Sequence, residues 1–103
     1  MNVQISSKNW NVPEADREQL ERRIARITKK LPHMNADLLH LVVRIDKQPK
    51  RDQYLCSARL GILKRVIAAR GKYNANARAA IGETFDDLER TLDKFMAALK
   101  ART

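Results

Sequence analysis

Two prolines bracket a stretch of the chain in which apolar residues repeat with helical spacing. The stretch covers residues 14–31, between Pro13 and Pro32. Proline is tolerated at the start of a helix but cannot continue its backbone hydrogen bonds, so the two prolines predict where a helix begins and ends. A helix that is apolar on one side requires a second layer of structure to bury that side. The apolar stripe consists of Leu20, Ile24, Ile27 and Leu31.

The basic residues of this helix gather on another side of it, within a sector of roughly 120°. No acidic residue follows Glu21 in the stretch, although protein surfaces normally mix the two signs of charge. Two interpretations stay open. The basic side is either a solvated surface, because Lys and Arg are good helix formers, or a surface that binds RNA phosphates. The residues concerned are Arg22, Arg23, Arg26, Lys29 and Lys30.

A second one-sided helix is predicted over residues 77–99. Asn74 or Asn76 is placed to cap its first turn. Its outer surface carries acidic residues, together with Arg90, Lys94 and Lys100, and we expect Asp86, Asp87 and Asp93 to point into solvent. The acidic residues are Glu83, Asp86, Asp87, Glu89 and Asp93. The apolar stripe, the longest in the chain, consists of Ile81, Phe85, Leu88, Leu92, Phe95, Met96 and Leu99.

Four further segments alternate in the manner of strands with one buried face. In the first segment, Val3, Ile5 and Ser7 share one face, and we expect this strand to be half buried. In the third segment, Cys56 lies on the inward face, where a buried thiol is inert. The predicted strands cover residues 2–10, 38–47, 53–60 and 65–70.

The order of these elements predicts the fold. Two one-sided helices need a sheet to cover, and the two-layer solution is a four-stranded mixed sheet with both helices packed on one face. The first helix is then a crossover, which makes the first two strands parallel, and the later strands form an antiparallel meander. We therefore predict an α+β fold with the order βαβββα. A chain of 103 residues suits a single domain, residues 1–103.

The net charge is +9 at pH 7 and is unevenly distributed. Residues 36–72 hold nine basic residues against three acidic ones, whereas residues 73–103 hold five of each. A basic excess of this size favours a polyanionic partner, with nucleic acid ahead of an anionic membrane. The bases of the later strands and loops either contact RNA or keep an exposed sheet soluble. They are Arg59, Lys64, Arg65, Arg70 and Lys72.

Several classes of chemistry lack their sequence signatures. Cys56 is the only cysteine, so neither an intrachain disulfide nor a cysteine zinc site is expected. His33 and His40 do not have the spacing of metal ligands, and no phosphate-binding glycine motif or nucleophile elbow occurs. We therefore expect no enzymatic activity, no cofactor, no metal site and no small-molecule substrate. No apolar run approaches the roughly 18 residues of a membrane span, so we expect a cytoplasmic protein without a membrane partner.

Two stretches resemble a known family when taken in order along the chain. One is MNVQISSKNWNVPEADREQLERRIARITK at the start, and the other is Ala79-Ala80-Ile81 followed by FDDLERTLDKF. They are similar to the short ribosome hibernation-promoting factors and ribosome-associated inhibitors, also called ribosomal subunit interface proteins. The resemblance implies a non-enzymatic factor that binds the small ribosomal subunit near the channel for messenger and transfer RNA. There it would hold translation off under stress, with basic residues of both helices contacting ribosomal RNA.

The last helix departs from the family pattern. Asp87 stands where a lysine is usual, and Arg78 stands where a tyrosine is common, whereas Arg90 and Lys94 match basic positions of the family. These departures keep an alternative open: a basic protein-interaction or regulatory module that shares the fold but does not bind ribosomes. No long C-terminal extension follows, so we expect a monomer rather than a factor that dimerises ribosomes through a second domain.

Overall fold

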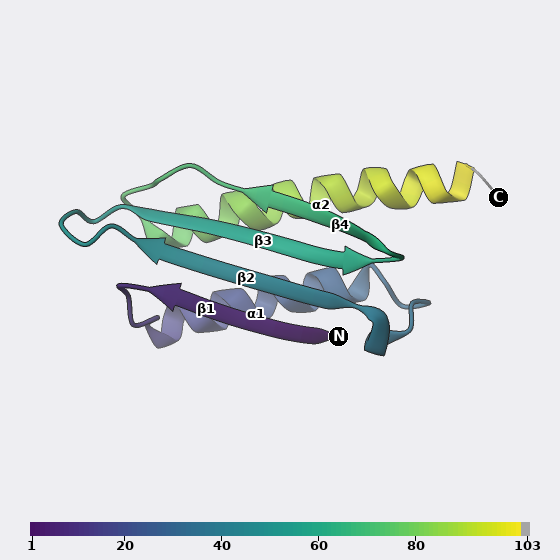
Figure 1. Cartoon of the computed structure of the whole chain (residues 1–103), viewed down its shortest axis with the longest axis horizontal. Helices are drawn as coiled ribbons and strands as arrows, with labels where there is room; N and C mark the ends of the chain where they lie inside the picture. The colour runs from purple at the N-terminus through teal and green to yellow at the C-terminus, as the bar shows by residue number, and fades with distance from the viewer. Residues whose placement is uncertain (102–103) are drawn as a thin grey trace.

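The helices and strands follow the predicted order in the computed structural model, which describes residues 1–101 (Figure 1). Residues 102 and 103, which the single-domain prediction also covers, lie outside the described part. A short 3-10 helix, η1, precedes the second strand. The elements are β1 (Asn2–Lys8), α1 (Glu14–Lys29), η1 (Ala36–Leu38), β2 (His40–Lys47), β3 (Tyr54–Ile62), β4 (Arg65–Arg70) and α2 (Ala77–Ala101).

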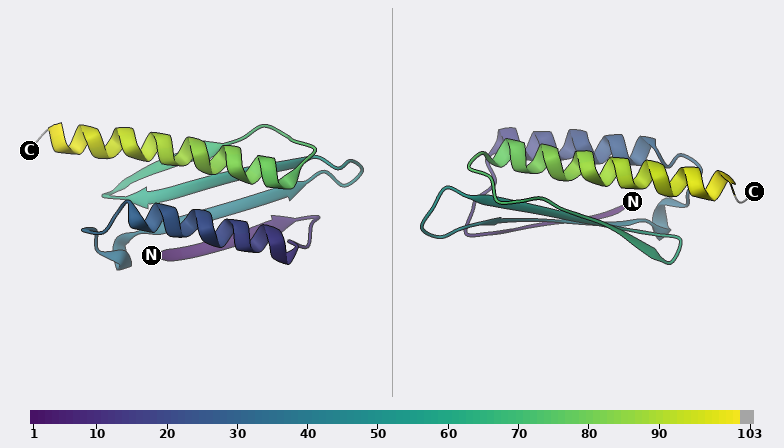
Figure 2. Two further views of the ribbon diagram at one scale, coloured as in Figure 1. Left: turned by 180° about the vertical axis from the view of Figure 1, so that it is seen from behind. Right: turned by 90° about the horizontal axis from the view of Figure 1, so that it is seen from above.

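The four strands form one mixed sheet in the order β1-β2-β3-β4. β1 and β2 are parallel, with α1 as the crossover between them, and β3 and β4 continue as an antiparallel meander. Both helices cover the same face of the sheet and leave the other face uncovered (Figure 2). The predicted α+β architecture, with two helices packed on one face of a four-stranded mixed sheet, is confirmed.

The core lies between the two helices and the covered face of the sheet. Alternate residues of β2 point toward the helices, and Leu41, Val43 and Ile45 are 0% exposed. The apolar stripes of the helices meet them, with Leu20 of α1 and Phe85 of α2 equally buried. Hydrophobic periodicity therefore identified the buried side of each helix correctly.

β1 is more exposed than its alternating sequence predicts. Val3 and Ile5 are 41% and 42% exposed, and no residue of β1 is buried. Their partners in the register, Leu41 and Val43, are fully buried, so the side chains do point toward the helices. β1 is an edge strand, however, and a hollow of about 140 Å³ lies between it and α1. The prediction that β1 is half buried is therefore wrong, because α1 does not cover the edge of the sheet.

The ends of β1 and β3 differ from the prediction for local reasons, whereas α2 begins where predicted. β1 ends at Lys8 because Asn9 has a φ of 59°, a left-handed conformation that interrupts a strand. β3 continues to Ile62, since Leu63 and Lys64 form the two-residue turn with φ values of 49° and 63°. Asn76 caps α2 through its Oδ1, which accepts a hydrogen bond from the backbone N–H of Ala79 at 3.2 Å.

A side-chain hydrogen bond joins the first half of α2 to the backbone of β3. The hydroxyl of Thr84 donates to the carbonyl of Cys56 at 3.1 Å. Gly71 lies beside this bond, and a Cβ there would come 2.8 Å from Thr84 Oγ1. Cys56 is 0% exposed, and burial raises the pKa of its thiol to about 11. The prediction that Cys56 faces inward is confirmed, and the thiol stays protonated at neutral pH.

Candidate nucleic-acid interface

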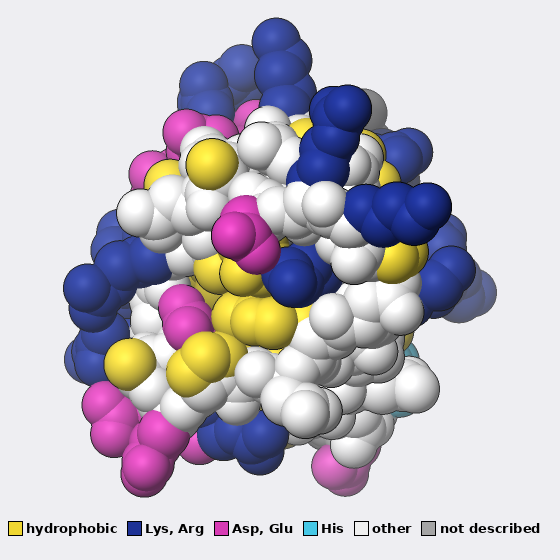
Figure 3. All heavy atoms as spheres, turned by 90° about the vertical axis from the view of Figure 1, so that its left-hand side faces the viewer, with side chains coloured by type: hydrophobic (Ala, Val, Ile, Leu, Met, Phe, Trp, Pro, Cys, Tyr) yellow, Lys and Arg dark blue, Asp and Glu magenta, His cyan; other side chains and the backbone are white. Residues whose placement is uncertain are grey.

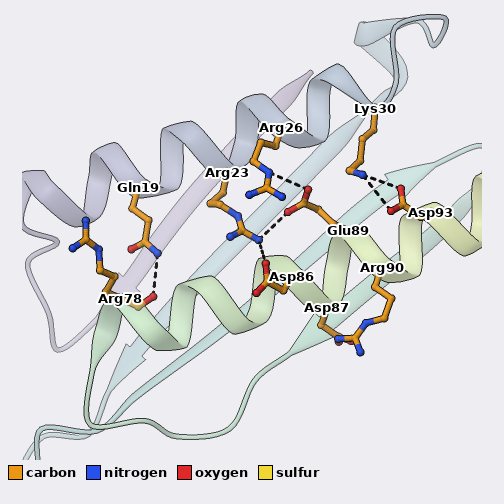
Figure 4. A network of polar contacts seen from close by, with 10 residues as sticks. All are labelled: Gln19, Arg23, Arg26, Lys30, Arg78, Asp86, Asp87, Glu89, Arg90 and Asp93. Atoms are coloured by element: carbon orange, nitrogen blue, oxygen red, sulfur yellow. Dashed lines mark hydrogen bonds and ion pairs between the residues drawn. The ribbon is translucent and has the colours of Figure 1, made fainter.

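Arg23 of α1 points across the space between the helices toward two carboxylates of α2 (Figure 4). Its Nη2 donates to Asp86 Oδ1 and to Glu89 Oε2, the second at 2.8 Å. The guanidinium also lies over the ring of Phe85, with Cζ 5.9 Å from the ring centroid. Only 14% of the Arg23 side chain is exposed. Arg23 therefore links the two helices, and little of its charge faces solvent.

Two further bases, Arg26 of α1 and Lys30 directly after α1, pair with the same helix. Arg26 Nε lies 3.2 Å from Glu89 Oε1, and Lys30 Nζ lies 3.0 Å from Asp93 Oδ1. The helices lie side by side, so bases spaced three and four residues apart meet acids of α2 that are also spaced three and four residues apart (Figure 4). The acidic residues of α2 thus neutralise part of the basic side of α1.

Glu89 is 6% exposed, so the prediction that it lies on the outer surface of α2 is wrong. That prediction treated α2 alone, whereas α1 lies against this side of the helix. Both carboxylate oxygens of Glu89 have a cationic partner, Arg23 for one and Arg26 for the other. A carboxylate with such partners is buried at much lower cost than an unpaired one. Asp86 and Asp93 remain exposed, with 64% and 60% of their side chains accessible.

A groove of about 390 Å³ lies between α1 and α2 and carries both signs of charge. It brings together residues that the sequence proposes as RNA contacts: Arg26, Lys30, Arg90 and Lys94. It is also lined by three acids: Asp86, Glu89 and Asp93. The groove is therefore close to balanced in charge, unlike the continuous basic face that the sequence of α1 alone predicts.

Other bases of the two helices are exposed. Arg22, Lys29 and Lys94 face solvent and form no ion pair within residues 1–101. Arg90 pairs with Asp87 on its own helix at 3.4 Å, but 65% of its side chain stays exposed. These four exposed residues present positive charge from the helix layer to a partner.

The uncovered face of the sheet holds a second group of bases. The register places Arg59 of β3 between Val42 of β2 and Ala68 of β4. One row along, Ser57 of β3 lies between Arg44 and Arg70. Since side chains alternate across a strand, all of these point away from the helices. Arg59 and Arg70 therefore lie on one surface, and the helix candidates lie on the opposite layer.

Arg44 belongs to this second group, although sequence reasoning did not select it. Its Nε donates to Asp46 at 2.9 and 3.2 Å, and 54% of its side chain remains exposed. The sequence contains the information needed to select Arg44, because the alternation of residues 38–47 already puts it on the face away from the core. Within the four strands, the uncovered face has four bases and one acid, Asp46. The bases are Lys8, Arg44, Arg59 and Arg70.

The remaining candidates lie near the ends of the sheet. Lys64 is in the β3–β4 turn, and Lys72 follows β4, both exposed. Arg65 pairs in register with buried Ile62 and lines a hollow of about 110 Å³ beside Phe95 of α2. The twelve predicted RNA-binding residues thus form no single patch but are divided between the helix layer, the uncovered face and the sheet ends.

Figure 3 views the molecule along its length, with the helix layer on the left and the uncovered face on the right. Lys and Arg side chains lie along both sides of this outline. Acidic side chains lie mainly in the left half of the view, at its upper and lower left, beside the basic ones of the helix layer. On the right-hand side of this view, the basic side chains thus have few acids beside them.

Within residues 1–101, no cluster of three or more potential metal ligands occurs. No helix in the same part of the chain combines the length and the apolar character needed to cross a bilayer.

Comparison with known proteins identifies relatives of the whole arrangement. The model of the family described as sigma 54 modulation protein / S30EA ribosomal protein matches residues 3–100. A ribosomal subunit interface protein from Coxiella burnetii is 16% identical, with a TM-score of 0.73 over 94% of this chain and 99% of that one. The Protein Y N-terminal domain of Thermus thermophilus is 19% identical, with a TM-score of 0.72 over 92% and 99%. At these identities the two structures show a shared fold. No curated protein matches the sequence.

Proposed function

Because the chain belongs to the sigma 54 modulation protein / S30EA ribosomal protein family, we propose that it is a non-enzymatic translation inhibitor. It binds the small ribosomal subunit through ribosomal RNA near the channel for messenger and transfer RNA, and it stabilises inactive ribosomes under stress. It acts in the cytoplasm as a monomer, without a cofactor. The observation that carries this proposal is the family match, which extends over residues 3–100.

The exposed bases of the helix layer supply the first contacts in this proposal. Arg22, Lys29 and Lys94 have no carboxylate partner within residues 1–101, and Arg90 is mostly accessible. Each neutralises a phosphate and releases condensed counterions, which gives affinity without reading sequence. Arg23 is left out of the contact set, because its guanidinium is already bound by Asp86 and Glu89.

The inhibition follows from occupancy. A folded domain lodged in the channel excludes messenger and transfer RNA by volume, so no bond has to be made or broken. Electrostatic attraction then determines how quickly the protein finds the subunit and how strongly salt displaces it.

The alternative, a protein-interaction module using an acidic last helix, loses support from the ion pairs of α2. Asp86, Glu89 and Asp93 are engaged by bases of α1. The acidic surface that would attract a basic protein partner is therefore largely neutralised within the domain.

Sucrose gradients of starved cells test the proposal. The protein should sediment with small subunits or whole ribosomes in low salt and move to the soluble fraction after a high-salt wash. Recovery in the soluble fraction alone, in both growing and starved cells, would reject ribosome binding.

A further inference from the structure

We propose that the uncovered face of the sheet is a second RNA-binding surface, on which Arg44, Arg59 and Arg70 hold the sugar–phosphate backbone of an RNA strand. This surface is separate from the helix layer and lies on the opposite side of the domain. The inference rests on the proposed function, which makes ribosomal RNA the ligand of this surface. Binding by the surface can nevertheless be measured with any RNA.

The positions of these arginines do not fit a purely protective role. Charges on edge strands discourage unwanted strand pairing, yet Arg44 and Arg59 belong to β2 and β3, the two central strands. Their backbone groups already pair on both sides, so no edge needs protection there. Only Arg70 lies on an edge strand. The placement thus favours binding over edge protection.

The choice of residue also points to phosphate. The centre of the face carries three arginines and no lysine. Arginine binds phosphate oxygens through two parallel N–H groups, whereas lysine offers a point charge. Solubility alone requires no such preference. Diagonal neighbours on one face of a sheet lie about 7–8 Å apart, so Arg59 is flanked by Arg44 and Arg70 at distances that long side chains bridge.

Asp46 orients one of the three arginines. It accepts from Arg44 Nε at 2.9 and 3.2 Å, an interaction that restrains the side chain while the guanidinium remains largely exposed. Arg59 and Arg70 form no ion pair within residues 1–101. The face therefore keeps an excess of positive charge, whereas the groove between the helices is balanced by the acids of α2.

The residues directly opposite Arg59 are small or apolar, which leaves its guanidinium accessible to a sugar–phosphate backbone. Val42 is 40% exposed and Val66 is 57% exposed on this face, and Ala68 and Gly61 add little bulk. The strands place no Phe, Tyr or Trp on the uncovered face, where His40 is the one ring, so this face lacks the aromatic platform on which single-strand binders stack successive bases. Recognition should then follow backbone shape rather than base identity.

Three variants of equal charge separate the two surfaces. The first carries Arg44→Gln, Arg59→Gln and Arg70→Gln on the sheet. The second carries Arg22→Gln, Lys29→Gln and Lys94→Gln on the helices. The matched control carries Lys50→Gln and Arg51→Gln in the β2–β3 loop and Arg17→Gln, an exposed base of α1 that lines the hollow beside β1. Binding to purified small subunits, and separately to a 20-nucleotide single-stranded RNA, is measured over a range of salt concentrations.

The sheet variant should bind both probes at least about tenfold more weakly than the control, with a salt slope lower by about 2 to 2.7 for three lost phosphate contacts. The single variant Arg59→Lys should bind the RNA less tightly than wild type although it keeps the charge. Equal binding by the sheet variant and the control would overturn the inference while leaving ribosome binding intact. If wild type fails to bind subunits, the proposed function fails, and the RNA probe decides the inference alone. Circular dichroism confirms that each variant is folded, and Arg59→Gln alone replaces the triple variant if it is not.

Discussion

Glu89 of α2 accepts a hydrogen bond from Arg23 of α1 at 2.8 Å, and their side chains are only 8% and 14% exposed. This contact assigns a structural role to a base that the sequence presents as a candidate RNA contact. It also explains why an acidic last helix is compatible with a basic first helix: the two sets of charges pair within the domain. The bases that remain for RNA are those that point elsewhere.

Removing the carboxylate of Glu89 should destabilise the fold. Glu89→Ala leaves Arg23 buried with Asp86 as its remaining partner, so we expect a loss of about 3 kcal/mol, near the lower end for a broken buried pair. Asp87→Ala breaks only the exposed pair with Arg90 and should cost less than about 1 kcal/mol. Urea unfolding of the two variants measures the difference, and equal losses would show that burial does not strengthen the pair.

Arg22 and Arg23 are adjacent in sequence, but replacing them should have different effects, on subunit binding in one case and on stability in the other. Arg23→Gln should lower the urea midpoint and leave the affinity of the folded protein for small subunits unchanged, because its charge is already bound by α2. Arg22→Gln should weaken subunit binding and leave the urea midpoint unchanged, because Arg22 is exposed and unpaired within residues 1–101. A stronger effect of Arg23→Gln on subunit binding would contradict the division of roles.

Most of the fold was predictable because hydrophobic spacing is a local signal. The stripes of α1 and α2 and the alternation of β2 each reveal their buried side without knowledge of the neighbours. The exposure of Val3 and Ile5 was not predictable in this way, because it depends on how far α1 reaches over the sheet edge.

The site was harder to predict, because it depends on contacts between elements that are distant in sequence. The pairing of Arg23 with Glu89 joins residues 66 positions apart, and no helical periodicity reports which sides of two helices will meet. The sequence does predict the face on which Arg44 lies, since its strand alternates clearly. That Arg44 shares this face with Arg59 and Arg70, however, depends on the register of the strands.

Two glycines should differ sharply in their tolerance of a methyl group. Gly71→Ala would place a Cβ 2.8 Å from Thr84 Oγ1, so we expect a loss of about 1–3 kcal/mol from overpacking. Gly82→Ala meets only Gln19 Nε2 at 3.8 Å and lies inside α2, where alanine stabilises a helix by about 0.5–1 kcal/mol. Thermal melting distinguishes them, and a stabilising Gly71→Ala would refute the close approach.

Cys56 should react with thiol reagents only when the chain unfolds. Burial raises the pKa of its thiol from 9.0 to about 11, so the folded protein holds the proton more tightly than the unfolded chain. This contribution to stability is complete below pH 9, and it declines as the pH rises toward 11. Alkylation at pH 8 should be negligible in buffer and rapid in denaturant. Rapid labelling in buffer would mean that Cys56 is accessible.

Equilibrium binding of the wild-type protein to purified small ribosomal subunits, measured over a range of salt concentrations, tests the central claim most directly. The account predicts saturable binding whose affinity falls steeply with salt, with a slope near 0.7–0.9 for each phosphate neutralised. Absence of saturable binding at low salt would contradict it.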